Sequence, residues 1–328
     1  MLKHRILLAR LFGGLVIALP AAFSTASPDV WRLDSDENWT AISPQDKFLV
    51  AVVEVKKLVN TGQTEPARLA YEQLKKDFPD LADPDLDAFI EADLLFSQGD
   101  FTKAYRAYEK IIKERPQSRL RPAILDRQYA IGTAYLGGQK KSVLRVIKLK
   151  GDAEGVRIME TITDRAGIQS ALGLRAALAV AENYHKRELF NDEYLKWWEI
   201  SLQYKTGQIA KDALLAMAAS KHAIYNRRPE EKRAFYDPAN LSTAKTYYQI
   251  FVDRYPQDAE KLATNQIIKQ IDEQLAEKQL VIAQYYHRTG HIQSANLYYD
   301  MVLQDYPQTE AAQAASPTGR LRGQSRNN

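Results

Sequence analysis

The residue types that most often carry chemistry do not assemble any familiar reactive site by their spacing in this sequence. There is no cysteine, which excludes disulfides, thiolate metal ligands and a thiol nucleophile. His287 and His291 stand four residues apart, a spacing that would suit a metal ion on one continuous helix. Gly290 lies between them at an expected helix end, so the pair indicates two surface histidines at a turn. Gly-rich phosphate loops and Ser-centred elbows do not occur either, and we expect no enzyme, catalytic residue, cofactor or metal.

The tyrosines, in contrast, follow a strict spacing. An Ala is followed by a Tyr four residues later and by a Pro eight residues after that. Three of the copies also have a Gly five residues before the Ala, at Gly62, Gly99 and Gly290. A fixed internal grammar of this kind is typical of a repeat protein, and we expect its residues to form the core signature of the repeats. The four copies are Ala67, Tyr71 and Pro79, then Ala104, Tyr108 and Pro116, then Ala244, Tyr248 and Pro256, and last Ala295, Tyr299 and Pro307.

Each position of the repeat has a physical role in a pair of helices. Gly ends the first helix at positive φ, the small Ala faces that helix closely, and Pro stops the second helix. Tyr lies one turn beyond Ala on the same face, so the aromatic positions, including Trp197, are expected to be core residues and not a ligand-binding box. The pattern resembles the tetratricopeptide repeat. It predicts an all-α solenoid of helical hairpins, a right-handed superhelix of about five to six repeats.

The two ends of the chain are expected to lie outside these repeats. Lys3, His4 and Arg5 precede a short apolar stretch and a small-residue site ending at Ala26, which indicates a signal peptide over residues 1–26. Its removal leaves 42 basic and 41 acidic residues, without the basic surplus that nucleic-acid binding requires. Residues 311–328 are small and polar, and we expect a disordered tail there.

Between the ends we expect a lead-in segment, which forms a small hairpin over residues 27–43, and two groups of repeats at 44–168 and 169–310. The third repeat is looser: a helix over 120–136 precedes a basic insertion at 139–150. The insertion combines basic and aliphatic residues. It suits contact with anionic lipid or a partner, but a solvated hairpin or helix extension is the favoured interpretation.

The third and fourth repeats depart from the common pattern. Gly155, Met159 and Gly167 take the small, large and stop positions in the third repeat. In the fourth, Glu193, Trp197 and Lys205 replace Ala, Tyr and Pro.

The first helices of the first two repeats predict a groove for a peptide. Counting back from the Ala positions places a mixed apolar set on a non-core face. The predicted groove residues are Leu49, Val52, Lys56, Phe89, Asp93 and Phe96.

The C-terminal third resembles the outer-membrane assembly lipoprotein family BamD (ComL). The segments DPANLSTAKTYYQIFVDRYPQDAE and QYYHRTGHIQSANLYYDMVLQDYPQT follow the family's pattern, with Tyr286, Gly290, Ala295 and Pro307 at its matching positions. The early segment SQGDFTKAYRAYEKIIKERPQS matches the family's first repeats.

This resemblance implies a non-catalytic periplasmic scaffold for the assembly and insertion of outer-membrane β-barrel proteins. Its partners would be the barrel-forming assembly protein and unfolded barrel substrates. The docking side would include Asp253, Arg254 and Tyr255 together with the last repeat. Family members carry a lipidated cysteine that is missing here, so an indirect, peripheral membrane contact is expected. The alternative is a general envelope adaptor in cell-wall or division complexes.

Overall fold

The computed structural model describes residues 31–33, 39–41, 44–81, 84–143 and 147–317. The chain divides into two compact units, Met1–Asp83 and Pro84–Asn328. The boundary between the two units falls between Asp83 and Pro84. The grouping of the repeats into residues 44–168 and 169–310 stays a prediction. The expected signal peptide lies outside the described residues.

The first unit holds a hairpin and one helical pair. Strands β1 (Trp31–Leu33) and β2 (Trp39–Ala41) pair antiparallel, which confirms the hairpin expected in the lead-in segment. Helices α1 (Pro44–Asn60) and α2 (Thr64–Asp77) pack together through buried Val55 and Tyr71, among others.

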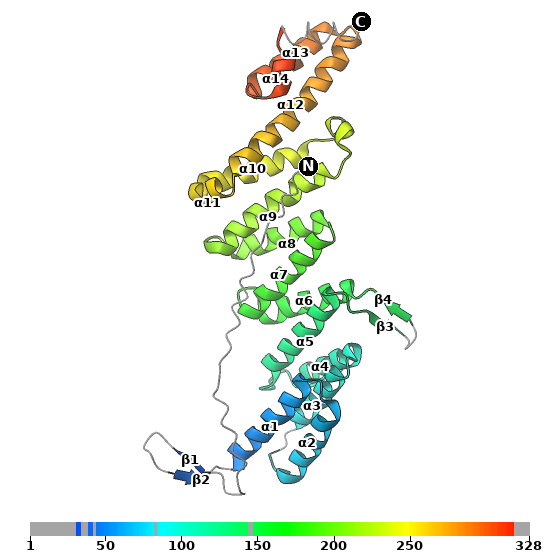
Figure 1. Ribbon diagram of the computed structural model, residues 1–328, viewed down its shortest axis with the longest axis vertical. Coiled ribbons are helices and arrows are strands. Elements are labelled where there is room, and N and C mark those ends of the chain that lie inside the picture. Colours follow the sequence, from blue (N-terminus) through cyan, green and yellow to red (C-terminus); the bar gives the residue numbers. More distant parts are fainter. Residues whose placement is uncertain (1–30, 34–38, 42–43, 82–83, 144–146, 318–328) are drawn as a thin grey trace. The chain divides into compact units, whose positions relative to one another are not determined.

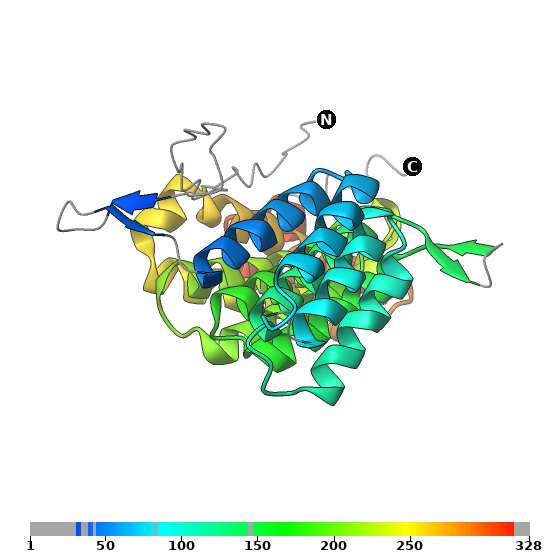
Figure 2. The ribbon, with the colours of Figure 1, turned by 90° about the horizontal axis from the view of Figure 1, so that it is seen from below.

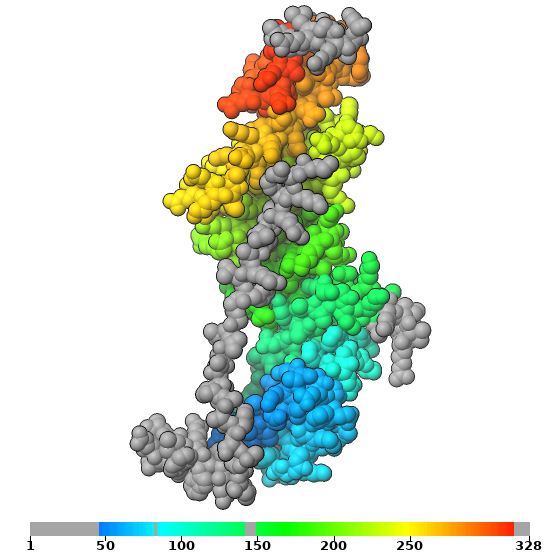
Figure 3. All heavy atoms as spheres, in the orientation of Figure 1, coloured from blue at the N-terminus to red at the C-terminus, as the bar shows by residue number. Residues whose placement is uncertain are grey.

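The second unit consists of helices with one further strand hairpin. Its pairs of helices pack side by side, and each pair contacts the next in chain order (Figure 1). The same succession runs from cyan to red in the space-filling view of Figure 3. The helices are α3 (Pro84–Ser97), α4 (Phe101–Glu114), α5 (Arg121–Leu136), α6 (Asp152–Ala166), α7 (Ala171–Lys186), α8 (Phe190–Gln203), α9 (Gly207–Asn226), α10 (Ala239–Arg254), α11 (Pro256–Lys261), α12 (Thr264–Arg288), α13 (Ile292–Asp305) and α14 (Glu310–Ala315), with a 3-10 helix η1 (Glu230–Phe235).

The Ala and Tyr positions of the repeats lie in the core. All four Ala residues are completely buried and all four Tyr residues are nearly so. Tyr299 of the last repeat is buried in one cluster with Ala295 and Val302, and its ring centroid lies 6.5 Å from that of His287 on α12. Gly290 has φ of 81° between α12 and α13, a backbone conformation that costs a side chain energy but not a glycine. The all-α helical-hairpin fold is thus confirmed in the described part of the chain.

The Pro positions of the repeats are not part of the core, and this corrects the expected core signature. The physical reason is that proline ends a helix through its backbone, so its ring needs no burial. The residue before each Pro leaves the helix in nearly the same conformation, with φ between −134° and −136°. The four exposed prolines are Pro79, Pro116, Pro256 and Pro307.

The irregular repeats keep this architecture with other side chains. Gly155 lies so close to α5 that an added Cβ would sit 2.7 Å from a Leu136 methyl group. Glu193 occupies the Ala position of the fourth repeat, buried and 2.9 Å from Nδ1 of His185. At both positions the helix still packs on its neighbours, α6 on α5 and α7, and α8 on α7 and α9.

The basic insertion is a strand hairpin, which confirms the hairpin interpretation and excludes a helix extension. β3 (Lys141–Val143) and β4 (Ile147–Leu149) pair antiparallel between α5 and α6. Figure 1 and Figure 2 both show the hairpin standing out from the helices of its unit. Lys141 holds its base through an ion pair of 2.8 Å with Glu154 on α6.

The C-terminal segment is more ordered than its composition suggests. The disordered tail predicted from residue 311 is wrong for its first part, because α14 packs on α12 and α13. Ala311, Ala312 and Ala315 are buried there, and Glu273 of α12 accepts hydrogen bonds from the first amides of α14. Small alanine side chains allow two helices to pack closely. A small, polar composition is therefore compatible with a packed helix as well as with a disordered tail. Residues 318–328 lie outside the described part.

Candidate protein-binding grooves

A groove with a mainly apolar lining lies where α8, α9 and α10 meet. We call it the α8–α10 groove, and its volume is about 370 Å³. The three helices follow one another in the second unit (Figure 1). The lining residues are Trp198, Ser201, Leu202, Tyr204, Lys205, Ala210, Leu214, Met217, Tyr247, Ile250, Arg254 and Tyr255.

The floor of the α8–α10 groove is part of the protein core. Leu214 and Met217 are buried in one cluster with Phe251, and Tyr247 packs against that cluster. The hydroxyl groups of Tyr247 and Tyr194 lie 3.0 Å apart, and burial together with this hydrogen bond raises the pKa of Tyr247 to about 12. The floor is therefore preformed and neutral at physiological pH.

One wall of the groove is an exposed apolar stripe on α8. Trp198 is 47% exposed and Leu202 is 44% exposed, and Leu195, one turn earlier, is 56% exposed. These residues are three and four apart, so they share one face of the helix. The adjacent Trp197 packs against the core cluster, so the two tryptophans point to different sides. Large apolar side chains left exposed together mark an interaction surface.

The rim of the groove carries two exposed cations. Lys205 follows α8 and Arg254 ends α10, and neither makes an ion pair with any other residue the structure describes. Lys211, on α9, differs because it pairs with Asp258 and lies 5.1 Å from the ring centroid of Tyr255. The groove therefore offers apolar contacts and positive charge that no described residue neutralises.

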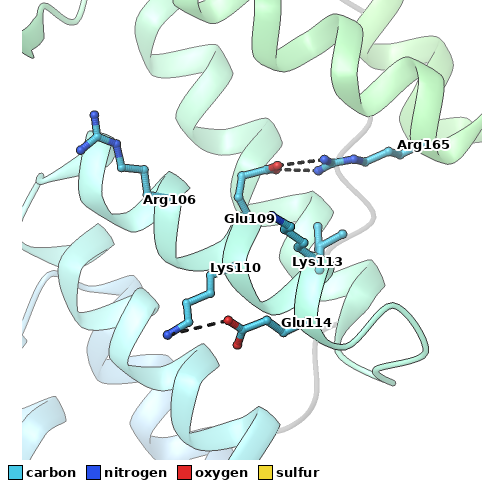
Figure 4. Close-up of a pocket in the computed structure, with 7 residues that line it drawn as sticks. Arg106, Glu109, Lys110, Lys113, Glu114 and Arg165 are labelled. Atoms are coloured by element: carbon cyan, nitrogen blue, oxygen red, sulfur yellow. Dashed lines mark hydrogen bonds and ion pairs between the residues drawn. The ribbon is translucent and has the colours of Figure 1, made fainter.

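A second hollow, the α4–α6 hollow, lies between those two helices and is lined mostly by charged residues (Figure 4). Its volume is about 510 Å³. Arg165 donates two hydrogen bonds to Glu109, at 2.5 and 2.8 Å, across the hollow. Burial alone would favour neutral Glu109, but the bonds and charge of Arg165 outweigh it and hold the pKa of this carboxyl below its ordinary value. The remaining lining residues are Arg106, Lys110, Ile112, Lys113 and Glu114.

The predicted docking residues fall at the α8–α10 groove. Arg254 and Tyr255 line it, and Asp253 is exposed beside them at the end of α10. Tyr255 packs on Phe251 with ring centroids 5.4 Å apart. Their role in docking stays a prediction, but the position is compatible with one.

The predicted peptide groove is wrong in its premise for Phe89 and Asp93. Phe89 is 2% exposed and packs on Tyr108, and Asp93 is 1% exposed and binds Arg127 through two hydrogen bonds of 2.9 Å. Residues 89, 93 and 96 are four and three apart, so they form the face of α3 that turns to α4. Phe96, partly buried, packs on Phe101.

The other three predicted groove residues belong to α1, in the first unit. Leu49 is exposed, whereas Val52 and Lys56 are partly buried. They are described only within that unit, and a peptide-binding role for them stays a prediction.

Sequence reasoning missed Trp198, Leu202 and Leu195. The signal was present: residues 195, 198 and 202 keep a helical spacing that continues past the core position of Trp197. When one face of a helix packs in the core, a second apolar face on the same helix indicates a binding surface. Telling the two faces of α8 apart required the neighbouring helices, because they show which face is covered.

Two further findings concern metal binding and membrane insertion. In the described ranges no three His, Asp or Glu residues are grouped in a way that could hold a metal ion. No described helix is both long and apolar enough to span a bilayer. His287 and His291 stand on either side of the break between α12 and α13.

Comparison with solved structures finds distant likenesses. PilW, a widely conserved type IV pilus biogenesis factor, aligns with a TM-score of 0.29 and 14% identity over 82% of this chain and 97% of its own. NprR in complex with its cognate peptide NprX aligns with a TM-score of 0.29 and 13% identity, over 84% and 71%. No curated protein matches the sequence.

Two family models match parts of the chain. Residues 89–118, which span most of α3 and all of α4, match a tetratricopeptide repeat. Residues 212–317, from α9 to the end of the described chain, match YfiO, an outer membrane lipoprotein family. YfiO is the BamD family, so the resemblance seen in the sequence is confirmed over these residues. This chain is thus an all-α protein of helical hairpins that is similar to the tetratricopeptide repeat over residues 89–118 and to the YfiO outer-membrane lipoprotein family over residues 212–317.

Proposed function

We propose that this protein is a periplasmic scaffold that takes part in the assembly and insertion of β-barrel proteins into the outer membrane. The observation that carries the proposal is the YfiO match over residues 212–317. That segment supplies α10 and most of α9, and so two of the three helices around the α8–α10 groove. The scaffold acts by binding, through area and shape complementarity along its helical hairpins.

The groove is suited to a protein partner. The floor of the groove is already fixed by the core, so little conformational entropy is lost there on binding. Trp198 is exposed, and tryptophan is among the residues that contribute most to the energy of protein interfaces. By family resemblance, the partner is the barrel-forming assembly protein, with unfolded barrel substrates as further clients. Membrane contact is then made through the partner.

Depletion of the protein in its native cell tests this function. We expect the amount of folded β-barrel protein in the outer membrane to fall, measured by heat-modifiable migration of several barrels on gels. Re-expression of the unaltered chain should restore it. Unchanged barrel levels with altered cell-wall composition or cell division would overturn the proposal in favour of a general envelope adaptor.

A further inference from the structure

We propose that the α8–α10 groove binds a partner segment that presents an apolar side chain flanked by carboxylates. The inference deepens the proposed scaffold function and rests on it, since it specifies the chemistry of the docking partner. It also makes a claim about binding that is measured without any assembly assay.

The apolar half of the recognition follows from the lining. Trp198 and Leu202 leave nearly half of their surfaces in water, and Leu214 and Met217 close the hollow beneath them. A volume of about 370 Å³ accommodates one or two large side chains. Covering this surface removes apolar area from water, which favours association.

The acidic half follows from the rim. Lys205, which follows α8, and Arg254, which ends α10, are exposed at the groove and have no ion-pair partner among the described residues. By contrast, Lys211 close by already pairs with Asp258. Two cations without an ion-pair partner beside the apolar α8–α10 groove attract carboxylates and repel basic segments.

The charges of the chain's own two ends decide whether either end could occupy the groove in place of a partner. The C-terminal residues after 317 contain Arg320, Arg322 and Arg326 and no acid, so they do not suit a basic rim. The lead-in contains Asp34, Asp36 and Glu37 between two tryptophans, a chemistry that would suit it. The proposal commits to a partner segment, and the experiment distinguishes this lead-in from it.

The probe is a fluorescein-labelled synthetic peptide with Phe and Leu one helical turn apart and Glu at the flanking positions. Its matched versions carry Lys in place of each Glu, or Ser in place of Phe and Leu. Anisotropy with the full chain at physiological salt gives each dissociation constant. We expect the Glu peptide to bind at least about tenfold more tightly than either matched peptide, because charge and apolar contact both contribute.

Variants of the full chain then locate the site. Trp198→Ala with Leu202→Ala should weaken binding of the Glu peptide about tenfold or more. Lys205→Glu with Arg254→Glu should reverse the preference toward the Lys peptide. The matched control is Arg106→Glu with Lys113→Glu, which reverses two cations of the α4–α6 hollow and should leave affinity within about twofold, since salt screens distant charges.

Three results would overturn the proposal. Equal binding of the Ser peptide would show that charge alone attracts the probe. An equal loss in the control variant would show an effect of net charge. If Asp34→Asn, Asp36→Asn and Glu37→Gln together raised the affinity tenfold or more, the chain's own lead-in would be the occupant.

The readouts keep this inference separate from the proposed function. Peptide binding with unchanged barrel levels on depletion would sink the assembly function and leave the groove assignment intact. Lost barrels together with an unreactive groove would do the reverse. Thermal unfolding of each variant by circular dichroism confirms that a loss of binding is not a loss of fold.

Discussion

The α4–α6 hollow and the α8–α10 groove differ in what surrounds their charged side chains: other charged residues in the hollow, and mainly apolar residues in the groove. In the hollow, Arg165 pairs with Glu109 across two helices and Lys110 pairs with Glu114, whereas Arg106 and Lys113 make no ion pair among the described residues (Figure 4). At the groove, Lys205 and Arg254 stay unpaired among described residues while aromatic and aliphatic side chains face water. Charges that satisfy one another stabilise the fold, whereas charges left open beside apolar surface are available to a partner.

The same contrast extends to the helices behind the hollow. Asp93 of α3 is buried and binds both Arg127 of α5 and the hydroxyl of Tyr108 on α4. Burial and the Asp93 charge raise the pKa of Tyr108, so it stays a neutral donor. One carboxylate thus ties three helices together, and nothing of this kind spans the α8–α10 rim among the residues described.

Removal of that carboxylate should have the largest effect on stability. Asp93→Ala leaves Arg127 and Tyr108 without their buried acceptor, and we expect a loss of about 3–5 kcal/mol in the free energy of unfolding. Urea unfolding measures it. Asp126→Ala, an exposed acid on α5, is the control and should change stability by less than about 0.5 kcal/mol. A loss below about 1 kcal/mol for Asp93→Ala would contradict the structural role.

The pair in the hollow should matter less, because it is only partly buried. Arg165→Met removes both hydrogen bonds to Glu109, and we expect a loss of about 1.5–3 kcal/mol. Arg106→Met, in the same hollow but without an ion pair among described residues, should change little. If urea unfolding gave equal effects for the two substitutions, the Arg165–Glu109 pair would contribute no more to stability than an unpaired arginine does.

Acid should remove the contribution of Glu109 selectively. Its folded-state pKa lies below the ordinary 4.5. The stability from this depressed pKa is therefore fully present above the unfolded pKa and is lost as pH falls through the folded one. Unfolding of the chain and of Glu109→Gln, compared from neutral pH to below about pH 4, should show a difference that shrinks on the acid side. A constant difference would contradict this assignment.

The rim of the α8–α10 groove should have the smallest effect on stability. Lys205→Glu with Arg254→Glu is expected to change the free energy of unfolding by less than about 0.5 kcal/mol, since neither side chain is part of an ion pair described here. The measurement is again urea unfolding, beside the Arg165→Met variant. A loss above about 1.5 kcal/mol would mean that these cations serve the fold and are not held in reserve for a partner.

Much of this molecule was predictable because local rules repeat along it. The Ala, Tyr and Pro positions indicated the helical pairs, since a small residue, an aromatic one turn later and a helix breaker each act within a few residues. Exposed Pro79 and Pro116 show that a position can fix where a helix ends without entering the core. Family resemblance predicts a docking role for Arg254, and this residue lies at the groove. The misplaced residues Phe89 and Asp93 share one helical face, and periodicity locates a face without saying what covers it.

The sequence by itself thus determined the helical hairpins, their order and the YfiO resemblance of the last third, because these depend on spacing along the chain. Only the tertiary structure decided which faces are covered. It buried Asp93 against α4 and α5, packed α14 on α12, and left Trp198 half exposed while the partly buried Trp197 packs against a core cluster. The physical reason is that burial depends on neighbours distant in sequence. The local sequence pattern around an apolar or charged side chain is the same whether another helix or a partner protein covers it.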